Sequence, residues 1–195
     1  MSLVVRPLTP SRWPDLEALF TARGCSVARG CWCMYYRVSG KGGLTRPGDG
    51  QRRTAKDALK ALASADPPAG LLGYRGKTPV GWISLGPRQD FAKLQKSPVM
   101  KPVDDRPVWS IVCFVVPSEY RKQGVARELL EGAIAFARKR GVELLESYPV
   151  DKEQPSAADA SWFGSQRMFD DAGFDEVARR RPDRPVMRLK LAPTP

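Results

Sequence analysis

Six consecutive residues, Arg121-Lys122-Gln123-Gly124-Val125-Ala126, have the types and spacing that anion binding requires. Gly124 lets the backbone approach an anion closely, and the small Ala126 leaves the first helical turn unobstructed. A helix that begins here directs several backbone N–H groups and the positive end of its dipole toward one point. Arg127 adds to the positive charge of the turn. The pattern predicts a site for a diphosphate group.

The chain has no histidine, which restricts the chemistry that its side chains can perform. Ser-His-Asp and Cys-His catalysis are excluded, as is every zinc site that uses histidine. Any acid or base must be a carboxylate, tyrosine, cysteine, lysine, a chain terminus or water. The patterns G-x-G-x-x-G and G-x-x-x-x-G-K-S/T are also absent, which removes support for a dinucleotide site or a Walker-type nucleotide site.

The cysteines are the second group of side chains with reactive atoms: Cys25, Cys31, Cys33 and Cys113. The first three are close enough in sequence to offer thiolates to a metal or to act as a redox sensor. They lack the paired C-x-x-C spacing of structural zinc sites, and no histidine completes a ligand set. Small, reduced, buried side chains are the favoured interpretation. We therefore expect no metal.

The phosphate-binding turn must be held between a strand and a helix. Residues 108–116 form an apolar, β-branched run typical of a central strand buried on both faces, and Pro117 ends it. Residues 124–140 repeat apolar side chains at helical spacing, with three cations in the last turn and Gly141 as a C-terminal cap. This strand–turn–helix context distinguishes the motif from a glycine that only starts a helix.

The rest of the chain alternates strands and helices. We predict further strands over 3–6, 70–74, 80–85, 142–148, 174–178 and 186–191, and helices over 10–22, 51–65 and 160–171. Glycine-rich residues 39–50 form a loop, and the long irregular segment 86–107 is typical of a functional lid. The order β-α-α-β-β-β-α-β-α-β-β predicts a mixed α/β sheet in a single domain over residues 1–195.

Composition places the chain among ordinary globular proteins, with 42% hydrophobic and 27% charged residues. No apolar run reaches the ~20 residues that span a bilayer, and the first residues lack the pattern of a signal peptide. We therefore expect a cytoplasmic protein without membrane contact. The net charge of +11 suits nucleic acid or a polyanionic small molecule. Because the basic residues are not interleaved with aromatic ones in a nucleic-acid motif, we expect no nucleic-acid partner.

The phosphate turn resembles the signature of the GNAT superfamily of acyl-CoA N-acyltransferases, R/Q-x-x-G-x-G/A between the fourth strand and the third helix. Residues 121–126 match it, and residues 168–174 resemble the family's late helix with its Gly-Phe ending. The resemblance extends over about residues 3–191 and marks a subgroup with a Cys-Trp-Cys-Met segment. It implies a central, mostly antiparallel sheet with a splayed parallel pair and helices on both faces.

The resemblance implies an N-acetyltransferase in which an amine attacks acetyl-CoA directly in a ternary complex. The backbone of residues 114–116 would hydrogen-bond the pantetheine arm like an added strand, and an N–H within residues 113–115 would stabilise the oxyanion. The full set of implied CoA contacts is Phe114, Val115, Val116, Arg121, Lys122, Gln123, Gly124, Val125, Ala126 and Arg127. No motif identifies the acceptor amine or the acyl length, and a homodimer is a candidate assembly.

The chain departs from the family at the proton-transfer positions. Phe169 occupies the place where many relatives have a tyrosine that protonates the CoA thiolate, and residues 109–116 contain no carboxylate. The candidate catalytic acids are Tyr148, Cys33 and Ser165, and the candidate substrate contacts are Trp32, Tyr35 and Glu146. For each of them, packing or solvent exposure is the alternative interpretation. The missing acid and base leave a second hypothesis open, a non-catalytic CoA-binding or regulatory module.

Overall fold

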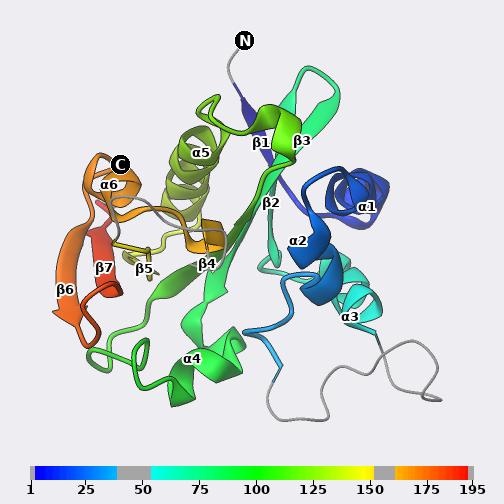
Figure 1. Ribbon diagram of the computed structural model, residues 1–195. Coiled ribbons are helices and arrows are strands. Elements are labelled where there is room, and N and C mark those ends of the chain that lie inside the picture. The colour runs from blue at the N-terminus through cyan, green and yellow to red at the C-terminus, as the bar shows by residue number, and fades with distance from the viewer. Residues whose placement is uncertain (1–2, 39–53, 152–160, 193–195) are drawn as a thin grey trace.

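A mixed β-sheet runs through the middle of the computed structural model, which describes residues 3–38, 54–151 and 161–192 (Figure 1). Within these residues the sheet has seven strands in the order β1-β2-β3-β4-β5-β7-β6. Their bounds are β1 Val4–Pro7, β2 Gly70–Arg75, β3 Thr78–Pro87, β4 Trp109–Val115, β5 Leu144–Ser147, β6 Asp175–Arg179 and β7 Pro185–Lys190. Neighbouring strands are antiparallel except β4 and β5, which run parallel. The expected mixed sheet with one parallel pair is confirmed.

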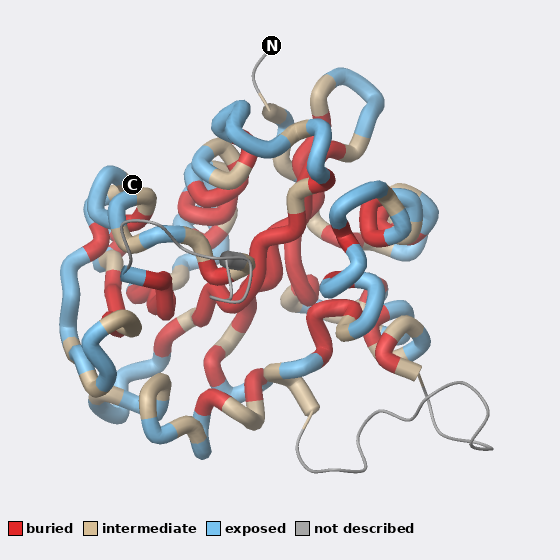
Figure 2. Tube along the Cα trace, in the orientation of Figure 1, coloured by how far each residue is buried: buried red, intermediate tan, exposed pale blue. Residues whose placement is uncertain are grey.

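Helices cover both faces of this sheet. The described α-helices are α1 Trp13–Thr21, α2 Ser26–Cys31, α3 Ala55–Ala61, α4 Ala92–Lys96, α5 Val125–Lys139 and α6 Gln166–Asp170. On one face α5 packs against β1, β2 and β3, while α1 packs against β3 on the other. Each face has its own cluster of buried hydrophobic side chains. Figure 2 shows the buried positions following the central strands between these two helical layers.

The position of α5 is fixed by an apolar side and a close contact. Its buried residues share one side of the helix: Val125, Leu129, Leu130, Ala133, Ile134 and Ala137. At Gly132 the helix approaches β1 so closely that an added Cβ would lie 2.4 Å from Cγ2 of Val5. Only glycine fits at that distance. The packing of α5 on the sheet therefore also sets where its first turn, which follows the predicted phosphate site, can lie.

The opposite face carries α2, a helix that the sequence does not predict. It has six residues and buries only Ala28, so it lacks a periodic apolar pattern. The neighbouring α3 begins at Thr54, whose side chain accepts a hydrogen bond from the Asp57 amide while the Asp57 carboxylate accepts one from the Thr54 amide. This capping box marks the start of the helix, which the sequence predicts from residue 51; residues 51–53 lie outside the described residues.

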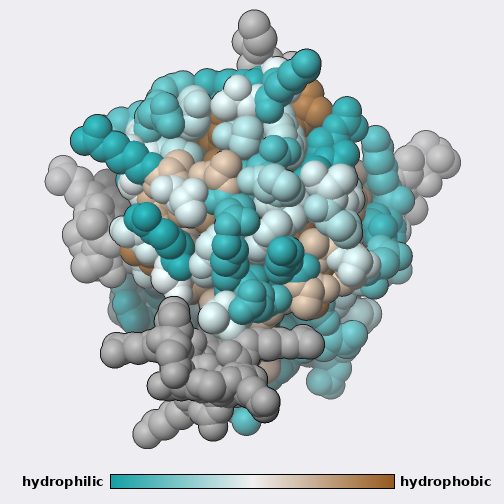
Figure 3. All heavy atoms as spheres, turned by 90° about the vertical axis from the view of Figure 1, so that its right-hand side faces the viewer, coloured by the Kyte–Doolittle hydropathy of each residue, from teal (hydrophilic) through white to brown (hydrophobic). Residues whose placement is uncertain are grey.

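One other predicted helix differs from the structure. The helix expected over 160–171 is shorter, because Ser165 has an extended backbone and its Oγ accepts a hydrogen bond from Met168 N (3.4 Å), which caps α6. The loop predicted over 39–50 lies outside the described residues. No helix in the described part of the chain is long and apolar enough to cross a bilayer. Figure 3 shows the side that carries α1, α2 and α3, where hydrophilic residues dominate the surface.

Candidate active site

The predicted phosphate turn lies between β4 and α5 and has the geometry of an anion site. Lys122 and Gly124 both have left-handed backbones, with φ of 58° and 79°. Turns of this kind direct successive N–H groups toward one concave side. Glu128 N donates to Gly124 O (3.0 Å) and closes the first helical turn, so the amides before it need acceptors from outside the helix. Among the described residues, no side chain caps this end of α5.

Arg121 holds the turn in place through backbone contacts. Its Nε donates to Val116 O (3.0 Å), and its Nη2 donates to Gly24 O (2.6 Å) in the segment before α2. Ser118 strengthens the same junction, because its amide and its Oγ both donate to Arg23 O at 3.0 and 3.2 Å. The turn is thereby joined to a segment almost 100 residues earlier in the chain. Arg121 thus shapes the site in addition to giving it charge.

Two other predicted phosphate contacts have protein partners of their own. The side-chain oxygen of Gln123 accepts a hydrogen bond from Arg75 (2.8 Å), which turns this residue away from the cavity described below. Arg127 forms an ion pair with Asp171 (2.6 Å) in which both side chains are more than 40% exposed. In this candidate anion site the backbone N–H groups are consequently the more available donors, and the cationic side chains surround them.

β4 changes partners halfway along its length. It pairs with β5 only from Trp109 to Ile111, and its pairing with β3 shifts register so that Val112 is an extra, bulged residue between Ile111 and Cys113. Bulges of this kind redirect the strand and its side chains. Beyond the bulge, residues 112–116 line a cavity instead of continuing the ladder with β5. This is the splayed edge that the sequence led us to expect.

A cavity of about 920 Å³ joins the open edge of β4 to the phosphate turn. Of the predicted residues it is lined by Phe114, Val115, Val116, Arg121, Lys122, Gly124, Val125, Ala126, Arg127, Cys33, Tyr35 and Ser165. Further lining residues come from the start of α2, from Cys31 and Tyr36, and from Tyr120, Trp162 and Arg167. The lining runs from the open edge of β4 to the turn before α5, an arrangement suited to an extended ligand with an anionic end.

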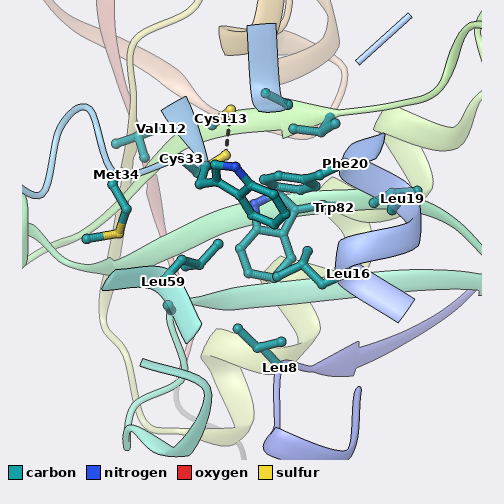
Figure 4. Close-up of a cluster of buried hydrophobic side chains, with 14 of the residues drawn as sticks. Leu8, Leu16, Leu19, Phe20, Cys33, Met34, Leu59, Trp82, Val112 and Cys113 are labelled. Atoms are coloured by element: carbon teal, nitrogen blue, oxygen red, sulfur yellow. Dashed lines mark hydrogen bonds between the residues drawn. The ribbon is translucent and has the colours of Figure 1, made fainter. Parts of the chain in front are cut away.

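The inner wall of the cavity contains a pair of thiols. Cys33 Sγ donates a hydrogen bond to Cys113 Sγ at 3.3 Å, as Figure 4 shows beside Trp82 and Phe20. This hydrogen bond, together with burial, raises the pKa of the Cys33 thiol well above its usual range. Cys33 therefore stays protonated at neutral pH. Within the described residues, no three Asp, Glu or Cys side chains are grouped as a metal site.

Trp32 differs from its expected place at a substrate site. It ends α2 in a left-handed conformation, and its ring packs between those of Trp13 (centroids 5.7 Å apart) and Phe20 (5.1 Å). With 7% of its surface exposed, it belongs to the core and does not line the cavity. Tyr35 is in contrast about half exposed and does line it. The left-handed backbone at Trp32 ends α2, so that Trp32 packs in the core while Tyr35 reaches the cavity.

Tyr36, which the sequence groups with Trp32 and Tyr35 as a candidate lining of an aromatic pocket, lies at a junction between two cavities. It lines both the main cavity and a smaller hollow of about 340 Å³ that also involves Tyr35, Lys93 and Met100. Burial, followed by the neighbouring Tyr35, raises the pKa of Tyr36 above its usual range. In the sequence, the cluster of aromatic residues at 32–36 indicates this region. Only the structure, in which Tyr36 borders two cavities, distinguishes Tyr36 from a core residue.

Glu146 and Tyr148 are enclosed in a charged network and do not line the cavity. Both are 0% exposed. Tyr148 OH donates to Glu146 Oε1 (2.6 Å) and shares a hydrogen bond with Ser110 Oγ (2.9 Å), while Arg88 contacts both the hydroxyl and the carboxylate. Burial and the Glu146 charge raise the pKa of Tyr148 well above its usual range. The hydroxyl expected to serve as an acid is therefore held in a structural network.

The same network fixes the long segment that we expected to act as a lid. Arg188 donates to Glu146 Oε2 (2.9 Å) and forms two hydrogen bonds with Asp104 (2.6 and 3.0 Å). Arg88 donates to the carbonyls of Leu94 and Met100. Residues 88–104 are thus tied to β5 and β7 by buried arginines. No sequence motif announces these arginines, because their partners are distant in the chain.

Comparisons with known proteins agree with this geometry. A model of the acetyltransferase (GNAT) family matches residues 42–161, more than half of the chain. No curated protein matches the sequence. Among solved structures, the NatC complex bound to Gag peptide and CoA is similar at a TM-score of 0.56 and 15% identity, covering 98% of this chain and 100% of that one.

Two further structures have the same fold. The GNAT domain of S. lividans PAT has a TM-score of 0.55 and 19% identity, with 96% of this chain and 89% of that chain covered. The PaiA N-acetyltransferase from Thermoplasma acidophilum, solved in complex with coenzyme A, has a TM-score of 0.53 and 16% identity, with 98% and 100% covered. These solved structures share the fold of this chain, and the family match over more than half of its length shows that the chain belongs to the acetyltransferase (GNAT) family.

Proposed function

We propose that this protein binds acetyl-CoA in the 920 Å³ cavity and transfers its acetyl group to an amine by direct attack in a ternary complex. The observation that carries the proposal is the continuity of this cavity, which joins a backbone anion site to an open strand edge. A diphosphate and a flexible amide-containing arm are the two chemical features that such a cavity fits. The proposal takes the whole chain as one acetyltransferase domain that acts in the cytoplasm.

Each part of the cavity has a role in this proposal. The amides from Lys122 to Ala126 hold the diphosphate, and the N–H and C=O groups of residues 114–116 orient the arm as an added strand. The bulge at Val112 turns the neighbouring backbone toward the thioester, where an N–H stabilises negative charge on the carbonyl oxygen. Acetyl-CoA supplies the activated acyl group, so the protein contributes positioning, exclusion of water and proton transfer.

Proton transfer is assigned to groups that reach the cavity. Of the three predicted acids, Cys33 and Ser165 line it, whereas Tyr148 does not. Tyr36 is a further donor at the junction with the smaller hollow, where we place the acceptor amine. Loss of a general acid lowers the rate by roughly 10²- to 10⁴-fold. Single variants Cys33→Ala, Ser165→Ala and Tyr36→Phe should show which of them lowers kcat with little change in KM.

Calorimetry with desulfo-CoA tests the proposed cofactor site. Gly124→Glu places a carboxylate and a strained left-handed residue at the turn, and should weaken binding by at least about 100-fold. Gly141→Glu is the matched control, because Gly141 also has a positive φ (69°) but lies at the other end of α5 in open space. Absence of binding by the unmodified protein, or equal losses in both variants, would contradict the proposed site.

A non-catalytic CoA-binding module is the second candidate, favoured by Phe169 at the position of the usual tyrosine and by its complete burial. This alternative expects tight binding of CoA without acetyl transfer to any amine. A panel of small amines and peptide N-termini, assayed by release of free CoA thiol, separates the two. Transfer to one of these amines above the rate of hydrolysis would eliminate the module hypothesis.

A further inference from the structure

Cys33 and Cys113 form a dithiol at the inner wall of the cavity. They are 80 residues apart in sequence, yet their sulfur atoms are 3.3 Å apart. Both are free and buried, with 5% and 8% of their surfaces exposed, and both line the cavity. Sulfur atoms in a disulfide are separated by about 2.05 Å, so roughly 1.2 Å of further approach would join them.

The backbone holds the two sulfurs in this arrangement. Trp32 and Cys33 are consecutive left-handed residues, with φ of 46° and 51°, a conformation that side chains with a Cβ adopt only when their surroundings enforce it. The stacking of Trp32 on Trp13 and Phe20 supplies that enforcement. Cys113 follows the bulged Val112 in β4. Both thiols are therefore placed by features that depart from regular backbone geometry.

We propose that Cys33 and Cys113 are an oxidative modification site, a dithiol that a peroxide reaching it through the cavity converts to a disulfide. The Cys113 sulfur accepts the Cys33 S–H and is the first to react. It attacks one oxygen of hydrogen peroxide, the O–O bond breaks, and the departing hydroxide leaves as water with the Cys113 proton, which gives a sulfenic acid on Cys113. The Cys33 sulfur then attacks the Cys113 sulfur, and the hydroxyl departs with the Cys33 proton as a second water.

The balance is two thiols and one peroxide giving one disulfide and two waters. Hydrogen peroxide is reduced, and the two sulfurs lose the two electrons. Because Cys113 directly precedes the strand edge at residues 114–116, the bridge lies where the reactive end of an acyl donor is expected. A bound ligand should consequently shield the thiols; this shielding rests on the proposed function, whereas the bridge itself does not.

Cys31 supplies a matched control for the pair. It lines the same cavity and is more exposed than Cys33. A hydrogen bond to Cys33, followed by burial, raises the pKa of the Cys31 thiol. If reactivity depended only on access from the cavity, Cys31 would react as readily as Cys33. If it depends on the 3.3 Å pair, Cys31→Ser should behave like the unmodified protein.

The test uses the reduced full-length protein exposed to dilute hydrogen peroxide. We expect two of its four thiols to disappear, with a mass loss of about 2 Da and a cross-linked peptide joining Cys33 to Cys113. Cys31→Ser should form the same cross-link at the same rate. Cys113→Ser and Cys113→Ala lack one sulfur of this cross-link, and their loss of thiols in peroxide should be at least about tenfold slower; two variants are used so that a packing defect in one does not decide the result.

Three results would overturn the proposal: a bridge between Cys31 and Cys33, mass gains from sulfinic or sulfonic acids in place of the loss, or undiminished loss of thiols in both Cys113 variants. Desulfo-CoA, which has no thiol of its own, is added in a separate arm and should slow the bridge at least about tenfold at saturation. If calorimetry shows no binding of desulfo-CoA while the bridge still forms, the proposed function fails and the modification site stands.

Discussion

The turn before α5 and the network around Glu146 both gather charged groups, but they do so by opposite means. The turn uses exposed backbone amides and side chains from seven consecutive positions, 121–127. The network uses buried side chains from positions 88, 110, 146, 148 and 188, together with Asp104, whose side chain is 40% exposed. It holds two arginines against two carboxylates, so its charges cancel internally.

This difference indicates that the turn is available to bind a ligand, whereas the network holds other segments of the chain in place. Charges at the turn face solvent and a cavity, so they can be satisfied by a ligand. Charges in the network are already satisfied by each other, and their hydrogen bonds extend to residues 94, 100 and 104 of the long segment after β3. We infer that damage to the network acts on stability, and that damage to the turn acts on affinity.

Glu146→Gln should give the largest effect, a loss of about 3–5 kcal/mol in the free energy of unfolding, because it leaves Arg88 and Arg188 buried with their shared carboxylate removed. Urea denaturation measures it. Asp66→Asn is the control, since Asp66 pairs with Arg140 but its side chain is 78% exposed, and it should change stability by less than about 1 kcal/mol. Similar losses in the two variants would remove the distinction between buried and exposed pairs.

Gly132→Ala should come next, with a loss of about 1–3 kcal/mol from overpacking. An alanine inside a helix is ordinarily more stabilising than glycine by about 1 kcal/mol. A loss of stability in this variant would therefore show that the contact with β1 is too close for a Cβ. The added Cβ would lie 2.4 Å from Cγ2 and 2.7 Å from Cβ of Val5. Combining it with Val5→Ala should restore part of the stability in a double-mutant cycle. A more stable single variant would show that the contact between α5 and β1 is not tight.

Acid should weaken the network and leave the turn unaffected. The hydrogen bonds from Arg188 hold the pKa of Asp104 below its usual range. A depressed pKa contributes stability above the unfolded value of about 3.9, and this stability is lost as pH falls through the lower folded value. Asp104→Asn should therefore be about 0.5–1 kcal/mol less stable at pH 7 and should lose less on acidification. Urea midpoints from pH 7 to pH 2.5 measure both; parallel profiles would contradict the assignment.

Asp171→Asn should have the smallest effect, and on affinity alone. It releases Arg127 from its exposed ion pair beside the phosphate turn. Desulfo-CoA should then bind roughly two- to fivefold more tightly at low ionic strength, and the gain should vanish in about 1 M salt, where surface charges are screened. Stability should change by less than about 0.5 kcal/mol. A gain that persists in high salt would point to a change in the shape of the turn.

The sequence predicts the turn before α5 better than it predicts the network around Glu146. The strand before the turn, the turn and α5 were predicted nearly to the residue, because glycine, proline and apolar spacing act over a few positions. The candidate acid Tyr148 and the substrate contacts Trp32 and Glu146 were placed at a cavity that they do not line. Their types suited the chemistry, but burial of each is decided by partners that are far away in the chain.

The sequence by itself determined the local elements, the tight turn before α5 and the match to the family, because each depends on residues within a few positions of one another. Only the tertiary structure decided which aromatic residues face the cavity, that Arg88 and Arg188 share Glu146, and that Cys33 lies against Cys113. Those contacts arise from strand register and helix packing, in which a displacement of one residue exchanges the two faces of a strand. No local pattern in the chain fixes such a choice.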